Sequence, residues 1–238
     1  MHSLRVGERL GVADVVTLSN AAVGIVAAVV AFSAPGIAAR LILLAAIADA
    51  LDGITARRFG SSEVGPLLDS ITDVVSFGAT PALFVYVVTA SSWGWYEAGV
   101  TSAPPAEAAV VLGVAAFFGV MSVVRTALYS QFVGEDELRP GIQNTLAATI
   151  LAAAYLGGFT WVPGILVGTV LLSVAMVAPV PYPKLAHRDA AAMGVVQFGA
   201  VVAPTVYFHA LPRLLLVAAF VYTFLAPRFY WGRSSDGE

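Results

Sequence analysis

The sequence contains no cysteine among its 238 residues, and it has few charged side chains of either sign. The absence of cysteine excludes disulfides, thiolate zinc sites and cysteine nucleophiles. Asp, Glu, Lys and Arg make up only 11% of the chain, against about 25% in ordinary soluble domains. The net charge of −3 provides no polybasic surface for nucleic acid. These shortages exclude disordered and nucleic-acid-binding chains and disfavour a soluble globular domain.

Hydrophobic residues, in contrast, make up 59% of the chain. Because so little polar surface cannot cover so much apolar volume, lipid must be the outer solvent. A membrane-spanning helix needs roughly 20 mostly apolar residues. The sequence therefore predicts an all-α, polytopic transmembrane helix bundle of about eight spans, at residues 15–34, 38–58, 67–91, 106–127, 143–160, 162–181, 190–204 and 211–227. The first 14 residues mix apolar and charged side chains without a cleaved-signal pattern, which favours an interfacial helix.

Basic residues gather at one side of this arrangement. With a cytoplasmic N-terminus, only Arg40 and Arg213 fall at the outer ends of the spans. The inner ends hold Arg5, Arg9, Arg57, Arg58, Arg125, Arg139, Lys184, Arg188, Arg228 and Arg233. This distribution follows the positive-inside rule and predicts a multi-pass protein of the cell membrane.

Four carboxylates lie within two of the apolar spans. Asp49 and Asp52 are three residues apart near the end of the second span, and Asp69 and Asp73 are four apart at the start of the third. Each pair shares a helical face, and the short connection makes the two helices antiparallel neighbours. An unpaired carboxylate costs about 2.5–3.5 kcal/mol near the centre of a membrane helix. Four of them predict bound hard cations, Mg²⁺ or Mn²⁺, or a pathway for cations or protons.

The residues around these carboxylates form a longer pattern. Its fixed positions are Asp49, Asp52, Gly53, Ala56, Arg57, Gly65, Asp69 and Asp73. This pattern resembles the signature of the CDP-alcohol phosphatidyltransferases. The resemblance implies an integral-membrane transferase with a six-span core at residues 15–185, preceded by segment 1–14 and followed by two further spans and a polar tail at 186–238.

Further segments resemble the phosphatidylserine and archaetidylserine synthase branch of that family. They are residues 68–82, Thr17 to Asn20 with Gly24, and Pro181 to Lys184. The chain departs from the branch at Leu128 and Ser130, where Arg and Asn are usual, and at Gln143 and Thr145, where proline is usual. These positions lie where an acceptor alcohol or lipid would be sensed. Glycerol 3-phosphate and inositol phosphate therefore stay as rival acceptors.

The resemblance implies that a phosphatidyl or archaetidyl group passes from a CDP-lipid, CDP-diacylglycerol or CDP-archaeol, to L-serine with release of CMP. Two divalent cations, Mg²⁺ or Mn²⁺, would be held by Asp49, Asp52, Asp69 and Asp73, with Asp73 also the general base. Nucleotide and phosphate contacts would come from Asn20, Asp49, Gly53, Ala56, Arg57 and Gly65. Arg125 could bind the serine carboxylate or extend to the membrane interface. The expected partners are the CDP-lipid, L-serine, membrane lipid and a second copy of the chain, with the active site facing the cytoplasm. A cation or proton transporter and a non-catalytic lipid-binding scaffold are the alternatives from other functional classes.

Overall fold

The computed structural model describes residues 10–60, 62–132, 139–183 and 187–229. Most of the expected interfacial segment, and the basic residues Arg5, Arg9, Lys184 and Arg233, lie outside these ranges. The described chain is built from helices, with one pair of two-residue strands. The helical elements are α1 (Val12–Ala31), α2 (Pro35–Phe59), α3 (Gly65–Val74), η2 (Val75–Ala79), α4 (Thr80–Ser92), η3 (Val100–Ser102), α5 (Pro105–Phe132), α6 (Asn144–Leu156), α7 (Val162–Val177), α8 (His187–Val202) and α9 (Val206–Phe229). The strands are β1 (Arg139–Pro140) and β2 (Pro181–Tyr182).

The prediction of an all-α, polytopic membrane bundle is confirmed. Four helical stretches are long and apolar enough to cross a membrane: Val12–Ala31, Gly65–Ser92, Pro105–Gln131 and Val206–Phe229. The helices α6 and α7 are apolar but shorter, with 13 and 16 residues. The elements α3, η2 and α4 continue as one helical rod. When this rod is counted once, each predicted span corresponds to one helix or to this rod within the described ranges.

Several predicted helix ends need correction. The first helix starts at Val12 rather than residue 15, because buried Asp14 accepts a hydrogen bond from the Gly11 backbone N–H at 2.6 Å. The helix α6 ends at Leu156 rather than 160, since Gly157 follows as its C-cap. The helix α7 ends at Val177, before Pro179 and Pro181. The last helix starts at Val206, ahead of the predicted 211, through a left-handed turn.

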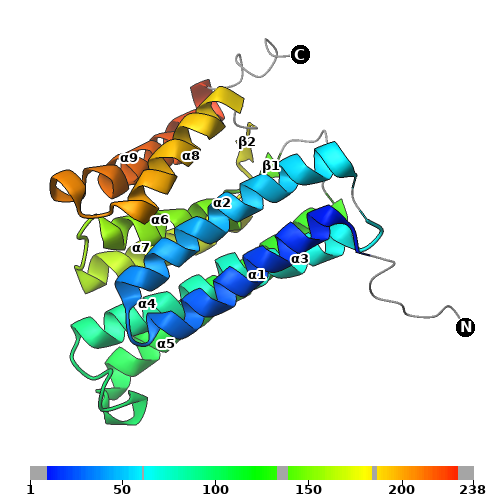
Figure 1. The fold of residues 1–238 in the computed structure, drawn as a ribbon. Coiled ribbons are helices and arrows are strands. Elements are labelled where there is room, and N and C mark those ends of the chain that lie inside the picture. The colour runs from blue at the N-terminus through cyan, green and yellow to red at the C-terminus, as the bar shows by residue number, and fades with distance from the viewer. Residues whose placement is uncertain (1–9, 61, 133–138, 184–186, 230–238) are drawn as a thin grey trace, which may run out of the picture.

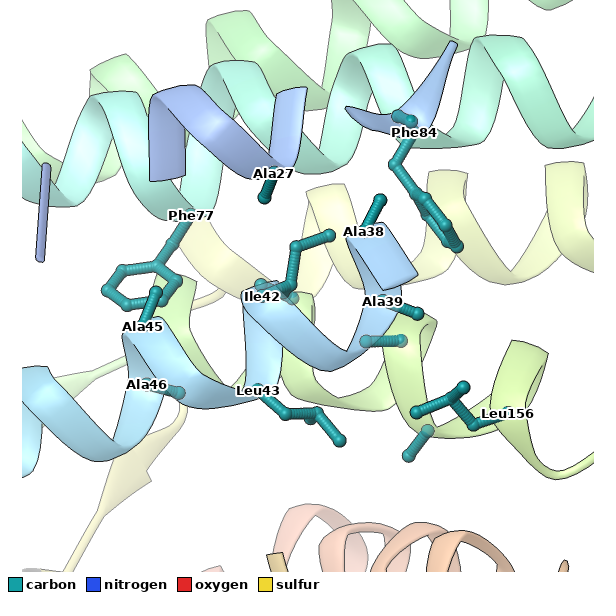
Figure 2. Close-up of a cluster of buried hydrophobic side chains, with 14 of the residues drawn as sticks. Ala27, Ala38, Ala39, Ile42, Leu43, Ala45, Ala46, Phe77, Phe84 and Leu156 are labelled. Atoms are coloured by element: carbon teal, nitrogen blue, oxygen red, sulfur yellow. The ribbon is translucent and has the colours of Figure 1, made fainter. Parts of the chain in front are cut away.

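The core consists of several hydrophobic clusters, one of which packs around α2 and the α3–η2–α4 rod. Alanines form most of the buried face of α2, among them Ala38, Ala39, Ala45 and Ala46. Phe77 of η2 and Phe84 of α4 point toward this face (Figure 2). Small side chains on one helix and aromatic rings on the other let the two rods pack closely, as membrane helices commonly do.

The helix α1 is fixed against the π-helical turn η2. The Ser76 hydroxyl donates to the Asn20 carbonyl at 3.2 Å, and the Thr80 hydroxyl donates to the Gly24 carbonyl at 3.0 Å. A Cβ atom on Gly24 would overlap Ser76, so glycine is needed for this close approach. Such π-turns are frequent at functional sites, and this one fixes the depth of α1 relative to the acidic face of α3.

The last two helices form a hairpin at one edge of the bundle, against α2 and α6 (Figure 1). The Gln197 amide of α8 donates to the Leu43 carbonyl at 2.8 Å, and Arg40 Nε of α2 donates to the Val201 carbonyl. The hairpin is therefore attached to the main bundle by polar bonds as well as by apolar packing.

Candidate active site

Three carboxylates from two neighbouring helices converge in the half of the bundle that holds the α2–α3 connection. Asp49 lies on α2, and Asp69 and Asp73 lie on α3. Each offers an oxygen, and these oxygens all lie within 4.8 Å of one another. Asp69 is exposed, while Asp49 and Asp73 are half-buried. Oxygens this close can act as ligands of one cation.

Asp52 stands apart from this group of three. It is buried, with 6% of its surface exposed, and it accepts a hydrogen bond from the Thr17 hydroxyl of α1. It is still near enough to repel Asp49 and Asp69 electrostatically. The four predicted ligands thus divide into a converging trio and one adjacent carboxylate that is held by α1.

The trio has the chemistry of a site for a hard cation. One oxygen of Asp73 is buried and has no hydrogen-bond partner among the described residues. Asp49 receives one hydrogen bond, from the Thr145 hydroxyl of α6 at 3.3 Å. The donors are all oxygens, which divalent ions such as Mg²⁺ and Mn²⁺ prefer. The acidic cluster can therefore bind a metal ion, because the ion supplies the positive charge that these repelling groups need.

Arg125 of α5 is a basic side chain close to this cluster. It is 7% exposed, so its side chain is enclosed by the protein. Its Nε donates to the Ile142 carbonyl at 2.9 Å, and its guanidinium lies 4.9 Å from the centre of the Tyr129 ring. It also attracts Asp73 electrostatically. A buried guanidinium beside a half-buried carboxylate can pair with an anionic group of a substrate.

The turn at Gly141 and Ile142, whose carbonyl holds Arg125, is fixed by segments far along the chain. The Ile142 N–H donates to the Ala175 carbonyl of α7 at 3.0 Å, and the Gly141 N–H donates to the Val180 carbonyl at 2.9 Å. The strand β1, just before this turn, pairs with β2.

The strand β2 is in turn linked to α9. The Tyr182 hydroxyl of β2 donates to the Thr223 carbonyl of α9 at 2.9 Å, and the Tyr222 hydroxyl donates to the Pro183 carbonyl at 2.7 Å. We call these two tyrosine bonds the tyrosine clasp.

The residues predicted to contact nucleotide or phosphate are described to different extents. Asn20 is 1% exposed, and its side-chain oxygen lacks a hydrogen-bond partner within the described ranges. Gly53 follows Asp52 on α2, and Gly65 is the buried first residue of α3. Ala56 and Arg57 lie on α2, but their side chains lie outside the described part of the structure.

Two threonines that hold the carboxylates were not predicted as site residues. Thr17 lies one helical turn before the predicted site residue Asn20, so the two share a face of the first span. That shared face could have indicated Thr17 as a site residue. Thr145 lies 96 residues from Asp49, and no local spacing could connect them. Next to Thr145, the buried Asn144 amide donates to the Thr126 hydroxyl at 2.7 Å, which ties the start of α6 to α5.

Comparison with known proteins agrees with this geometry. The family model for CDP-alcohol phosphatidyltransferase matches residues 10–180. An archaetidylserine synthase from Methanothermobacter thermautotrophicus is 23% identical over 189 residues, which cover 78% of this chain and 75% of that protein. A CDP-diacylglycerol–serine O-phosphatidyltransferase from Methanocaldococcus jannaschii is 40% identical over 88 residues, 36% of this chain and 39% of the relative. One of the same name from Mycobacterium tuberculosis is 45% identical over 64 residues, 26% of this chain and 22% of the relative.

The family match covers well over half of the chain, and it includes all four carboxylates. The resemblance that the motif predicted is confirmed, and relatives named for serine transfer are among the similar proteins. The protein is an integral membrane protein whose apolar helices carry an acidic cluster, and it belongs to the CDP-alcohol phosphatidyltransferase family.

Proposed function

We propose that the protein transfers a phosphatidyl or archaetidyl group from a CDP-lipid to L-serine and releases CMP. The observation that carries this proposal is the convergence of Asp49, Asp69 and Asp73 beside the buried guanidinium of Arg125. Family membership supports the transfer chemistry. The names of the archaeal and mycobacterial relatives support serine as the acceptor.

Two divalent cations, Mg²⁺ or Mn²⁺, are the expected cofactors. Asp49, Asp69 and Asp73 would hold the first. Asp52 would help to hold the second, since a carboxylate that accepts one bond from Thr17 keeps lone pairs for a ligand. When bound, such ions neutralise the pyrophosphate and stabilise the departing nucleotide.

In the proposed reaction, the hydroxyl proton of serine passes to Asp73, and the lipid-bearing phosphoryl group passes to the serine oxygen. Asp73 accepts the proton of the serine hydroxyl, and its oxygen without a hydrogen-bond partner is suited to do so. The serine oxygen forms a bond to the lipid-bearing phosphorus as the bond from that phosphorus to the CMP oxygen breaks. The electron pair leaves with CMP. Positioning these groups in line is the main task of the protein in phosphoryl transfer.

The remaining site residues would bind the two substrates. Arg125 would pair with the serine carboxylate while the Ile142 carbonyl fixes its Nε. Asn20, Gly53, Ala56, Arg57 and Gly65 would contact or make room for the nucleotide and its phosphates. The buried amide oxygen of Asn20 supports this assignment because it has no partner among the described residues.

The basic charge available at the site favours serine over the phosphorylated acceptors. Glycerol 3-phosphate and inositol phosphate each bring a phosphate, which usually needs several basic groups. Among the described residues, Arg125 is the buried basic side chain of the site. One guanidinium matches one carboxylate, and the exposed carboxylate of Asp69 can face the serine ammonium.

The test is an acceptor panel with the purified protein. L-serine, glycerol 3-phosphate and inositol phosphate are each supplied with ester-linked or ether-linked CDP-lipid and Mg²⁺ or Mn²⁺, and CMP release and product mass are measured. We expect serine to give CMP and a serine lipid. Preference for a phosphorylated acceptor would reject serine but keep the transferase. Ion flux in liposomes without CMP release would favour a transporter, and neither activity would favour a lipid-binding scaffold.

We also propose that the active site faces the cytoplasm, that residues 15–185 form the transferase core, and that the protein forms a homodimer. The excess of basic residues on the side of the carboxylates supports the orientation. Mass measurement of the protein in lipid nanodiscs tests the dimer, which a single-copy mass would contradict.

A further inference from the structure

A mostly apolar cavity with several polar side chains in its wall lies away from the carboxylates. It has a volume of about 440 Å³, which is within the range of small-ligand sites. It lies between the start of α2, the end of α6 and the turn between α8 and α9. Its polar lining comes from Arg40, Tyr155, Thr160, Thr205 and His209.

The cavity is separate from the proposed active site. On α2, Arg40 precedes Asp49 by nine residues, which is about 14 Å of helix rise. On α6, Thr145 touches Asp49, whereas Tyr155 lines the cavity ten residues later. The rise along α2 and the rise along α6 thus give a similar separation of about 15 Å between the cavity and the carboxylates.

Arg40 supplies a positive charge that has no carboxylate partner there. Its Nε caps the end of α8 by donating to the Val201 carbonyl. A guanidinium has five N–H donors, and no acceptor for its other four is found within the described ranges. No carboxylate of the described residues lines the cavity. A guanidinium without a carboxylate partner can form charge-assisted hydrogen bonds with an anionic ligand.

His209 gives an independent indication of a ligand. Its Nδ1 is buried and has no hydrogen-bond partner among the described side chains and backbone groups. Tyr207, Phe208 and His209 all have positive φ angles, of 47°, 55° and 64°, which are unfavourable for residues other than glycine. Strained backbone of this kind concentrates at binding sites. Here the strain places an imidazole in the wall of the cavity.

The surroundings of the cavity match the membrane interface. Tyr207 and Phe208 are 85% and 87% exposed, and Trp161 is 65% exposed at the start of α7. Exposed Tyr and Trp side chains are typical of the depth at which lipid headgroups lie. Arginine side chains pair with phosphate groups, which lipid headgroups carry at that depth.

We propose that this cavity binds the phosphate group of a membrane lipid, with Arg40 as its ion-pair partner and His209 as a hydrogen-bonding partner. The hydroxyls of Tyr155, Thr160 and Thr205 complete the polar wall. The bound group is a phosphodiester, and the lipid chains extend into the surrounding bilayer. This site is distinct from the proposed donor and acceptor sites.

The experiment measures retention of dioctanoyl phosphatidylglycerol by the purified full-length protein, using native mass spectrometry. Dioctanoylglycerol, which lacks the phosphate, and inorganic phosphate are the comparison probes. Excess CDP is included so that lipid in the proposed active site is displaced. The variants are Arg40→Gln, Arg40→Lys and His209→Ala. The matched control is Arg213→Gln, because Arg213 also donates its Nε to a helix-end carbonyl, that of Gly157 at 2.9 Å, without lining the cavity.

We expect the wild type and Arg213→Gln to retain phosphatidylglycerol and not dioctanoylglycerol. Arg40→Gln should weaken retention at least tenfold, Arg40→Lys should weaken it less, and His209→Ala should weaken it several-fold. CMP release by each variant reports folding and separates this proposal from the proposed function. Equal retention by Arg40→Gln and Arg213→Gln, or equal retention of the two lipids, would overturn the proposal. Retention of inorganic phosphate without the lipid would assign the site to a free anion and reject the lipid.

Discussion

Asp73 has the surroundings of a proton acceptor. Its buried oxygen has no hydrogen-bond partner in the described chain, and Arg125 attracts its charge. We predict that Asp73→Asn lowers the rate of CMP release by about 10²–10⁴-fold, because an amide cannot accept the serine proton. CDP-lipid binding, measured by isothermal titration, should be largely kept, whereas Asp49→Asn should weaken binding too. Glu97→Gln, at an exposed position, is the control. Near-normal turnover by Asp73→Asn would remove it from the base role.

Thr145 stands where the serine branch usually has proline, and its hydroxyl donates to Asp49. Groups that orient a metal ligand commonly change metal affinity by about 10–100-fold when they are removed. We therefore predict that Thr145→Val raises the Mg²⁺ concentration for half-maximal CMP release by about that factor. Thr145→Ser keeps the donor and should restore the normal metal dependence. An unchanged metal dependence in Thr145→Val would show that this hydrogen bond does not position Asp49.

Gly141 occupies a backbone conformation that side chains disfavour. Its φ is +74°, and a Cβ atom there would overlap the Met176 carbonyl. We predict that Gly141→Ala destabilises the protein by about 1–3 kcal/mol and shifts the Ile142 carbonyl that holds Arg125. The KM for serine should rise more than the KM for CDP-lipid. Equal changes in both constants would contradict a specific effect through Arg125.

At the scale of elements, the contact between α1 and η2 decides how deep α1 lies in the bundle. Adding a methyl group at Gly24 would push α1 away from Ser76, and overpacking of this kind costs about 1–3 kcal/mol. We predict a lower thermal midpoint in detergent for Gly24→Ala. Gly113→Ala is the matched control, because a Cβ atom on this glycine of α5 would meet nothing within 4 Å. That variant should be as stable as the wild type or slightly more stable. Equal midpoints for the two variants would contradict the close contact.

The sequence predicted the elements better than their contacts. Apolar runs identified each helix, because lipid requires long apolar segments. The spacing of Asp49, Asp52, Asp69 and Asp73 predicted the helical faces on which these residues lie. However, the π-turn η2 has no sequence signature of its own, and it determines which carbonyls of α1 meet Ser76 and Thr80. Separation of Asp52 from the trio was likewise not predictable, because it depends on a hydroxyl from α1.

At the scale of the whole molecule, the absence of native cysteine allows a clean test of orientation. Glu63 lies exposed between α2 and α3, near the carboxylates, and Thr101 lies exposed in η3 at the other end of the helices. We predict that Glu63→Cys reacts with a membrane-impermeant maleimide only in inside-out vesicles. Thr101→Cys should react in intact cells. Labelling of Glu63→Cys in intact cells would reverse the topology.

The tyrosine clasp makes the active site depend on α9, a helix that is synthesised long after the site carboxylates. The four site carboxylates have been synthesised by residue 73, but the turn that fixes Arg125 is anchored through β2 to Thr223 and Tyr222 of α9. During membrane insertion, a nascent chain could therefore acquire metal early and stay inactive until the α8–α9 hairpin docks. Such an order would keep a half-inserted enzyme from consuming its nucleotide-activated lipid, and would couple activity to completed biogenesis.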